Sequence, residues 1–169
     1  MKTRVTSATS LIVLGSAVFG GCIVSPGDRA PDWALRDINH HERHLSDYAG
    51  KVVVMDFWAT WCSPCRFVSP HMQALQEKYG DKGLVVIGVH YNDQGDPAGY
   101  MKKHGYTLVS MMDGYEVARE YGVSKIPTII IVSRDGKVVH RQTGFATADA
   151  SKLEAIVECE LRKASRETG

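Results

Sequence analysis

The chain has 169 residues, of which 44% are hydrophobic and 23% are charged, and its formal net charge is +1. That length suits one domain with a short extension, and the composition supplies enough apolar side chains for a core. Because the net charge is small and no basic run occurs, the sequence lacks the electrostatic pattern of a nucleic-acid-binding protein.

The N-terminus has the pattern of an export signal. Two basic residues precede the apolar stretch 11–19, as the charged and apolar regions of a signal peptide do. Small residues then lead to Cys22. This short sequence resembles the lipobox of bacterial lipoproteins, except that Phe19 stands where that motif prefers Leu, Val or Ile. We therefore expect a signal peptide over 1–21 and a lipid-modified Cys22.

Two other interpretations of this segment stay open. The uncharged stretch 5–24 is long enough to span a bilayer without cleavage, and a plain secretory signal could be cut near Cys22. All three interpretations place the following domain outside the cytoplasm. Residues 22–29 are then a linker, 30–165 the domain and 166–169 a frayed tail.

The domain alternates apolar strands with amphipathic helices. The continuous apolar run 52–58 is typical of a central strand that is covered on both faces. A helix and a second buried strand, 84–89, follow it, and the two strands of such a unit are expected to be parallel. The order of elements predicts one α/β sandwich around a mixed sheet. The remaining elements are expected as strands at 30–35, 107–109, 128–132 and 137–141 and as helices at 97–104, 115–121 and 147–163.

Two cysteines lie where the strand 52–58 passes into the helix. A Cys-x-x-Cys pair at such a junction, here Cys62 and Cys65, is typical of a redox-active dithiol. A static disulfide would close too small a loop to stabilise the fold much, and a zinc site would need two further ligands. As the N-terminal residue of the helix, Cys62 would be favoured as a thiolate by the positive end of the helix dipole.

The acid in the strand 52–58 is Asp56. A carboxylate in an otherwise apolar, buried strand is costly unless it is paired or used, and burial raises its pKa. The alternative is an acid that is tolerated because its strand lies at an edge of the sheet.

Cys159 is the other cysteine of the domain. The apolar residues of the helix 147–163 share one face and Cys159 points away from it, which predicts an incidental, partly exposed thiol. A Cys22–Cys159 disulfide is an alternative only if Cys22 carries no lipid.

Three histidines, His40, His41 and His44, lie close together in a polar segment. Without a further ligand at regular spacing, we expect a solvated turn there rather than a metal site.

Together these motifs resemble the thioredoxin fold and, within it, the extracytoplasmic TlpA/ResA-like thiol-disulfide oxidoreductases. The resemblance rests on 30–33, 50–54, 57–66 and 122–128. It covers nearly everything from residue 28 to the last helix, and the helix and strand between 90 and 113 match the insertion of this branch. It implies a thioredoxin-like three-layer α/β/α sandwich around a mixed central sheet, with an N-terminal extension and a central helix–strand insertion.

The resemblance also implies roles for individual residues. Cys62 would attack the disulfide of a partner protein, and Cys65 would resolve the mixed disulfide. Asp56 occupies the position of the thioredoxin acid, which takes a proton from the second cysteine. Many ResA-type proteins carry a glutamate three residues after the second cysteine. This chain has Val68 there, so the role of that glutamate does not transfer.

The same family places a cis-proline opposite the dithiol. Ile126-Pro127 matches that position, although an X–Pro bond is trans by default. The backbone of Ile126 would pair there with an extended substrate segment. Trp61, beside Cys62, would belong to an exposed apolar rim, with ordinary packing as its alternative.

We therefore expect an envelope-anchored disulfide reductase without a cofactor or metal, acting as a monomer. Its partners would be a membrane thiol donor of electrons and extracytoplasmic proteins with disulfides, including apocytochrome c and copper-site assembly proteins.

The residues between the cysteines, Ser63 and Pro64, lack the histidine of strongly oxidising relatives, which favours reduction over a disulfide-forming oxidase. A thiol peroxidase is disfavoured by Ala59, where peroxiredoxins need threonine. A copper-binding module is disfavoured because such relatives space their cysteines more widely.

Overall fold

The computed structural model describes residues 24–164; the expected signal peptide, Cys22 and residues 165–169 lie outside them. The elements are β1 (Ala34–Arg36), β2 (Glu42–His44), a 3-10 helix (Leu45–Tyr48), β3 (Val52–Trp58), α1 (Cys65–Tyr79), a 3-10 helix (Gly80–Lys82), β4 (Leu84–His90), α2 (Pro97–His104), β5 (Val109–Met111), α3 (Tyr115–Glu120), β6 (Thr128–Val132), β7 (Val138–Thr143) and α4 (Thr147–Ala164). No helix within 24–164 is long and apolar enough to cross a membrane.

Five strands form the central sheet in the order β5-β4-β3-β6-β7. β3 and β4 run parallel, as the strand–helix–strand pattern predicts, whereas β6 runs antiparallel to β3. The sheet is therefore mixed, and β3 lies at its centre with every residue buried. This arrangement explains the unbroken apolar run in the sequence, because neither face of β3 meets water.

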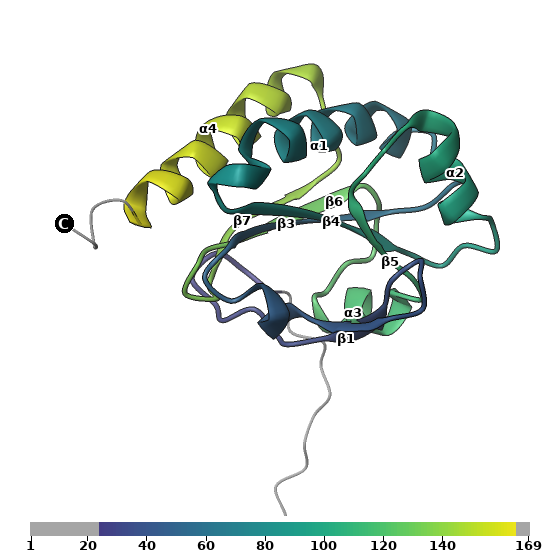
Figure 1. Ribbon diagram of the computed structural model, residues 1–169, viewed down its shortest axis with the longest axis horizontal. Coiled ribbons are helices and arrows are strands. Elements are labelled where there is room, and N and C mark those ends of the chain that lie inside the picture. Colours follow the sequence, from purple (N-terminus) through teal and green to yellow (C-terminus); the bar gives the residue numbers. More distant parts are fainter. Residues whose placement is uncertain (1–23, 165–169) are drawn as a thin grey trace, which may run out of the picture.

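The sheet is covered on both faces (Figure 1). On one face, apolar residues of α1, α2 and α4 pack against Val52 and Val54 of β3. On the other, α3 and the segment that contains β1 and β2 pack against Val53, Met55 and Phe57. The alternation of side chains along β3 thus supplies both cores, and the predicted three-layer α/β/α sandwich is confirmed.

The insertion after β4 begins as its sequence predicts. Asp96 caps α2 by accepting a hydrogen bond from the Gly99 amide at 2.8 Å, and Pro97 occupies the first turn. Pro lacks an N–H that would be unpaired at this place in any case. The helix ends at Gly105, whose φ of 70° lies in the left-handed region that terminates helices.

Two strand predictions were wrong. The first strand covers Ala34–Arg36 rather than 30–35, and it pairs with β2 in a separate two-stranded sheet instead of joining the central one. The Asp37 carboxylate accepts bonds from the Asn39 and His41 amides, which closes the turn between these strands. The second error lies before β5, where the Thr107 amide donates to Gln73 Oε1, and β5 begins only at Val109.

Candidate active site

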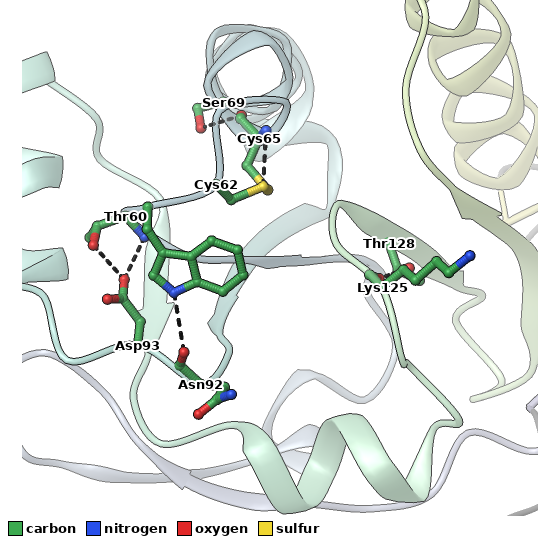
Figure 2. The surroundings of a disulfide bond; sticks show 9 residues. Thr60, Cys62, Cys65, Ser69, Asn92, Asp93, Lys125 and Thr128 are labelled. Carbon is green, nitrogen blue, oxygen red and sulfur yellow. Dashed lines mark hydrogen bonds between the residues drawn. A yellow bond between two sulfur atoms is a disulfide. The ribbon is translucent and has the colours of Figure 1, made fainter.

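Cys62 and Cys65 form a disulfide with a Cα–Cα distance of 5.3 Å at the carboxyl end of β3. Helix α1 begins at Cys65 with Pro64 as its N-cap, so the prediction that Cys62 is itself the first helical residue was wrong by three positions. The sulfur still lies at the helix N-terminus, because the Cys65 amide donates a hydrogen bond to Cys62 Sγ at 3.2 Å (Figure 2). An N–H in this position stabilises a thiolate on Cys62 when the disulfide is reduced.

Both cysteines are buried, whereas two large apolar side chains close to them in the sequence are not. Trp61 is 57% exposed and Phe67 is 74% exposed. Trp61 thus presents an exposed apolar surface next to the buried Cys62.

Asp56 lies in the central strand, so the alternative of an acid tolerated at a sheet edge is wrong. It lies on the same face of β3 as Val54 and Trp58. The core cluster on that face also contains both cysteines. The residue is 3% exposed, and its Oδ1 has no hydrogen-bond partner among the described residues. Burial raises the pKa of this carboxyl to about 7, since desolvation penalises the charged form. It can thus bind or release a proton near neutral pH.

The Ile126–Pro127 peptide bond is cis, as the resemblance implies. Pro127 directly precedes β6, and the first residue of β6, Thr128, pairs with Phe57 near the carboxyl end of β3. The proline therefore lies at the same end of the sheet as the disulfide. Figure 2 shows the segment from Lys125 to Thr128 on one side of the cysteines. Pro127 is buried, while Ile126 is only partly so.

A group of polar residues on the other side of the cysteines was missed from the sequence. His90 Nε2 lies 2.9 Å from Asp93 Oδ2, and the same oxygen accepts hydrogen bonds from the amide and the hydroxyl of Thr60. The Trp61 indole N–H donates to the Asn92 carbonyl at 3.2 Å. The sequence shows 92–95 only as a polar loop. The one sign of this group in the sequence was His90, which ends a buried strand and stands three residues before Asp93.

Two of the three histidines of the N-terminal hairpin lie close to acids of the same segment. His41 Nδ1 lies 3.6 Å from Asp37, and His44 Nε2 lies 3.5 Å from Glu42. Within 24–164, no three His, Cys, Asp or Glu side chains are grouped so that they could hold a metal ion.

Two further positions follow the sequence interpretation. Val68 is fully buried in the core beneath α1, so an apolar side chain fills the place of the ResA-type glutamate. Cys159 is an exposed free thiol on α4, as its place away from the apolar face predicts. Cys22 lies outside the described residues.

Known proteins are similar to this chain in sequence and in fold. The AhpC/TSA family profile matches residues 26–141. The thiol-disulfide oxidoreductase ResA of Geobacillus thermodenitrificans is 34% identical over 140 residues, 79% of each chain. ResA of Bacillus subtilis is 33% identical over 135 residues, which cover 78% of this chain and 75% of that one. The chain belongs to the ResA-like thiol-disulfide oxidoreductases.

Solved structures agree with this assignment. A Chlorobium tepidum protein described as a thiol:disulfide interchange protein DsbE matches with a TM-score of 0.76 and 36% identity, over 82% of this chain and 99% of that one. The exposed lipoprotein thioredoxin of Streptococcus pneumoniae matches with a TM-score of 0.63 and 30% identity, over 76% and 99%. This ResA-like protein is therefore an enzyme of thiol-disulfide exchange with a thioredoxin fold.

Proposed function

We propose that this protein is an extracytoplasmic disulfide reductase that works through Cys62 and Cys65. The thiolate of Cys62 attacks a disulfide of the partner protein, and one partner sulfur leaves as a thiolate. Cys65 then attacks Cys62 Sγ, which releases the second partner sulfur and forms the Cys62–Cys65 disulfide. Two electrons pass to the partner in each cycle, and a membrane thiol donor returns them by reducing the disulfide.

Asp56 is the proposed proton acceptor for Cys65. Resolution requires the Cys65 thiol to lose its proton in a core from which water is excluded. A carboxyl on the same side of the sheet, with a pKa of about 7 and one oxygen that has no partner among the described residues, suits that task. Val68 offers no competing acid.

Trp61, Ile126 and Pro127 are the proposed substrate-binding residues. Trp61 is exposed and directly precedes the buried Cys62, and the cis-proline lies at the same end of the sheet as the disulfide. An extended peptide could pair with the Ile126 backbone, as an added strand pairs with a sheet edge. The observation that carries the proposal is that the dithiol, the cis-proline and a buried carboxyl, one of whose oxygens has no partner within 24–164, lie towards the same end of β3.

The proposed location is the cell envelope, with Cys22 as the lipid anchor after removal of 1–21. The likeness to an exposed lipoprotein thioredoxin of Streptococcus pneumoniae supports this proposal, as do the basic, apolar and small residues that precede Cys22. Proteins of cytochrome c or copper-site maturation are the proposed partners.

Trapping of partners tests the proposal. Cys65→Ala is expected to leave the mixed disulfide on Cys62, so that envelope proteins are recovered covalently bound and are released by dithiothreitol. The double variant Cys62→Ala/Cys65→Ala is the matched control and traps nothing. Recovery of no cysteine-containing partner, or equal recovery with the control, would contradict the proposal.

The reduction potential of Cys62–Cys65 separates a reductase from an oxidase. Couples of this fold span roughly −120 to −270 mV, and reductases lie at the negative end. We expect a value in the more negative half of that range, measured by equilibration with glutathione or dithiothreitol. A value near −120 mV, the less negative end of that range, would make the protein a disulfide-forming oxidase.

A further inference from the structure

The loop between β4 and α2 contacts the two residues that precede Cys62. Asp93 accepts two hydrogen bonds from Thr60, and Asn92 accepts one from Trp61. Figure 2 shows Thr60 and Asp93 together on the left, with Asn92 below them, and Lys125 and Thr128 on the right. Residues 31 to 33 positions apart in the sequence thus hold one edge of the active site.

Asp93 is the centre of these contacts. Its Oδ2 accepts from His90 Nε2 and from both donors of Thr60, and its Oδ1 accepts from the Gly95 amide at 2.7 Å. Desolvation would raise the pKa of this carboxyl, but the hydrogen bonds from Thr60, Gly95 and His90 outweigh it and lower the pKa to about 2. The ionised carboxylate can only accept, so His90 Nε2 carries the hydrogen between them.

The loop is shaped for this close approach. Asn92 has a φ of 42°, in the left-handed region that asparagine tolerates better than most residues. A Cβ added to Gly95 would clash with Thr60 Oγ1, so a side chain here would displace Thr60. The close approach of this loop to Thr60 therefore depends on the backbone conformation of Asn92 and on the missing side chain of Gly95.

His90 ties this contact to the sheet. It is the last residue of β4 and pairs with Trp58 of β3, and both its side chain and that of Asp93 are only 4% exposed. Its ring lies 5.5 Å from the Trp58 ring. Asp93 is thus held from a rigid strand as well as from its own loop.

We propose that His90 and Asp93 are positioning residues that fix Trp61 for the docking of protein disulfides. Neither side chain reaches the surface, whereas Trp61 is exposed beside Cys62. Asp93 fixes the backbone of Thr60 and so the start of Trp61, and the loop that Asp93 anchors fixes the far end of the indole through Asn92. This inference rests on the proposed role of Trp61 in substrate binding.

A spectroscopic experiment tests the positioning itself. The indole N–H resonance of Trp61, assigned with Trp61→Phe, is expected to shift and broaden in Asp93→Ala and in His90→Ala. His90→Gln keeps an N–H donor near the Nε2 position and should restore the wild-type resonance. An unchanged Trp61 signal in Asp93→Ala would overturn the proposal, whatever the protein does with disulfides.

A kinetic experiment tests the consequence for docking. The reduced protein is mixed with insulin or with hydroxyethyl disulfide, and single-turnover oxidation is followed against disulfide concentration. Since a well-placed tryptophan at an interface contributes more than 1 kcal/mol in alanine scans, we expect Asp93→Ala to raise the half-saturation concentration for insulin about 5–10-fold. The rate with hydroxyethyl disulfide, which is too small to cover Trp61, should stay within about twofold.

Asp96→Ala is the matched control. It removes a carboxylate three residues away that caps α2 and, within 24–164, makes no hydrogen bond to Thr60 or Trp61, so both substrates should behave as with the wild-type protein. Equal losses with both substrates in Asp93→Ala, or no loss with insulin, would overturn the docking role. If neither disulfide oxidises the reduced wild-type protein, the proposed function is wrong, and this inference is wrong as well.

Discussion

Two buried carboxylates, Asp56 and Asp93, lie near the dithiol and have opposite properties. Asp56 has an oxygen without a partner in the described part of the chain and a pKa raised to about 7. Asp93 accepts four hydrogen bonds and has a pKa lowered to about 2. Burial is common to both, so the hydrogen bonds decide which one can exchange a proton and which one is a fixed anion.

The difference matches two tasks in one active site. A proton acceptor has to change its charge near neutral pH, and hydrogen bonds to its ionised form would prevent that. A residue that holds a loop in place has to keep its charge and its partners throughout the cycle. The two environments therefore predict opposite dependences of stability on pH, which the following variants isolate.

The largest expected effect is on the stability of Asp56→Asn. Because the folded pKa of about 7 lies above the ordinary value of 3.8, the native state keeps a proton that the unfolded chain loses. The wild-type protein therefore loses stability as pH rises from about 4 to about 7. Asp56→Asn should be more stable at pH 8 by up to about 4 kcal/mol, and little changed at pH 4.

Urea unfolding of the oxidised protein at pH 4, 6 and 8 measures this difference. Asp135→Asn is the control, since it changes an exposed acid of the β6–β7 turn. A stability difference between Asp56→Asn and wild type that does not grow between pH 4 and 8 would show that Asp56 is already ionised or has a partner.

The second effect is kinetic and concerns the same residue. Asp56→Asn removes the proposed proton acceptor, so resolution of the mixed disulfide by Cys65 should slow by about 10²-fold at pH 7, a typical loss for general acid–base catalysis. The defect should shrink at higher pH, where the Cys65 thiol ionises without help. Stopped-flow release of the partner thiol measures it, and unchanged kinetics between pH 6 and 8 would remove Asp56 from the mechanism.

The sequence reveals one of these carboxylates and hides the other for a physical reason. Asp56 stands alone in an apolar strand, where any acid is conspicuous because burial is costly. Asp93 stands in a polar loop, where an acid needs no explanation. Its burial comes from contacts with Thr60, 33 positions earlier, and no local pattern records such a contact.

The same distinction separates the strands that the sequence predicts from those that it does not. β3 and β6 lie fully buried and have the bounds that their apolar runs predict. β1 and β2 are three residues each and mostly exposed, and the Asp37 carboxylate closes the turn between them. Short strands of this kind depend on one polar contact rather than on periodicity, so hydrophobic pattern alone misplaces them.

The third effect mirrors the first and concerns Asp93→Asn. Here the folded pKa of about 2 lies below the ordinary value of 3.8, so the ionised carboxylate stabilises the native state above about pH 4 and this contribution is lost as pH falls to about 2. Asp93→Asn should cost about 2 kcal/mol at pH 7. Its stability should converge with that of the wild-type protein on acidification, measured by urea unfolding at pH 7, 4 and 2.5. A constant deficit across that range would mean that the hydrogen bonds do not favour the ionised form.

The smallest expected effect is that of Thr60→Val, which tests how much one of the four hydrogen bonds to Asp93 contributes to stability. Thr60→Val keeps the shape of the side chain and the backbone N–H, and removes only the hydroxyl that donates to Asp93 Oδ2. Loss of one of four hydrogen bonds to a charged group should cost about 1.5 kcal/mol at pH 7, less than Asp93→Asn. It should also move the acid limb of the stability curve to higher pH, because the pKa of Asp93 rises when a donor is lost.

Thr143→Val is the control, since its hydroxyl contacts Thr128 rather than a carboxylate, and it should leave the acid limb in place. If Thr60→Val and Asp93→Asn cost the same, the hydroxyl alone would account for the low pKa of Asp93, and the amides and His90 would add nothing to it.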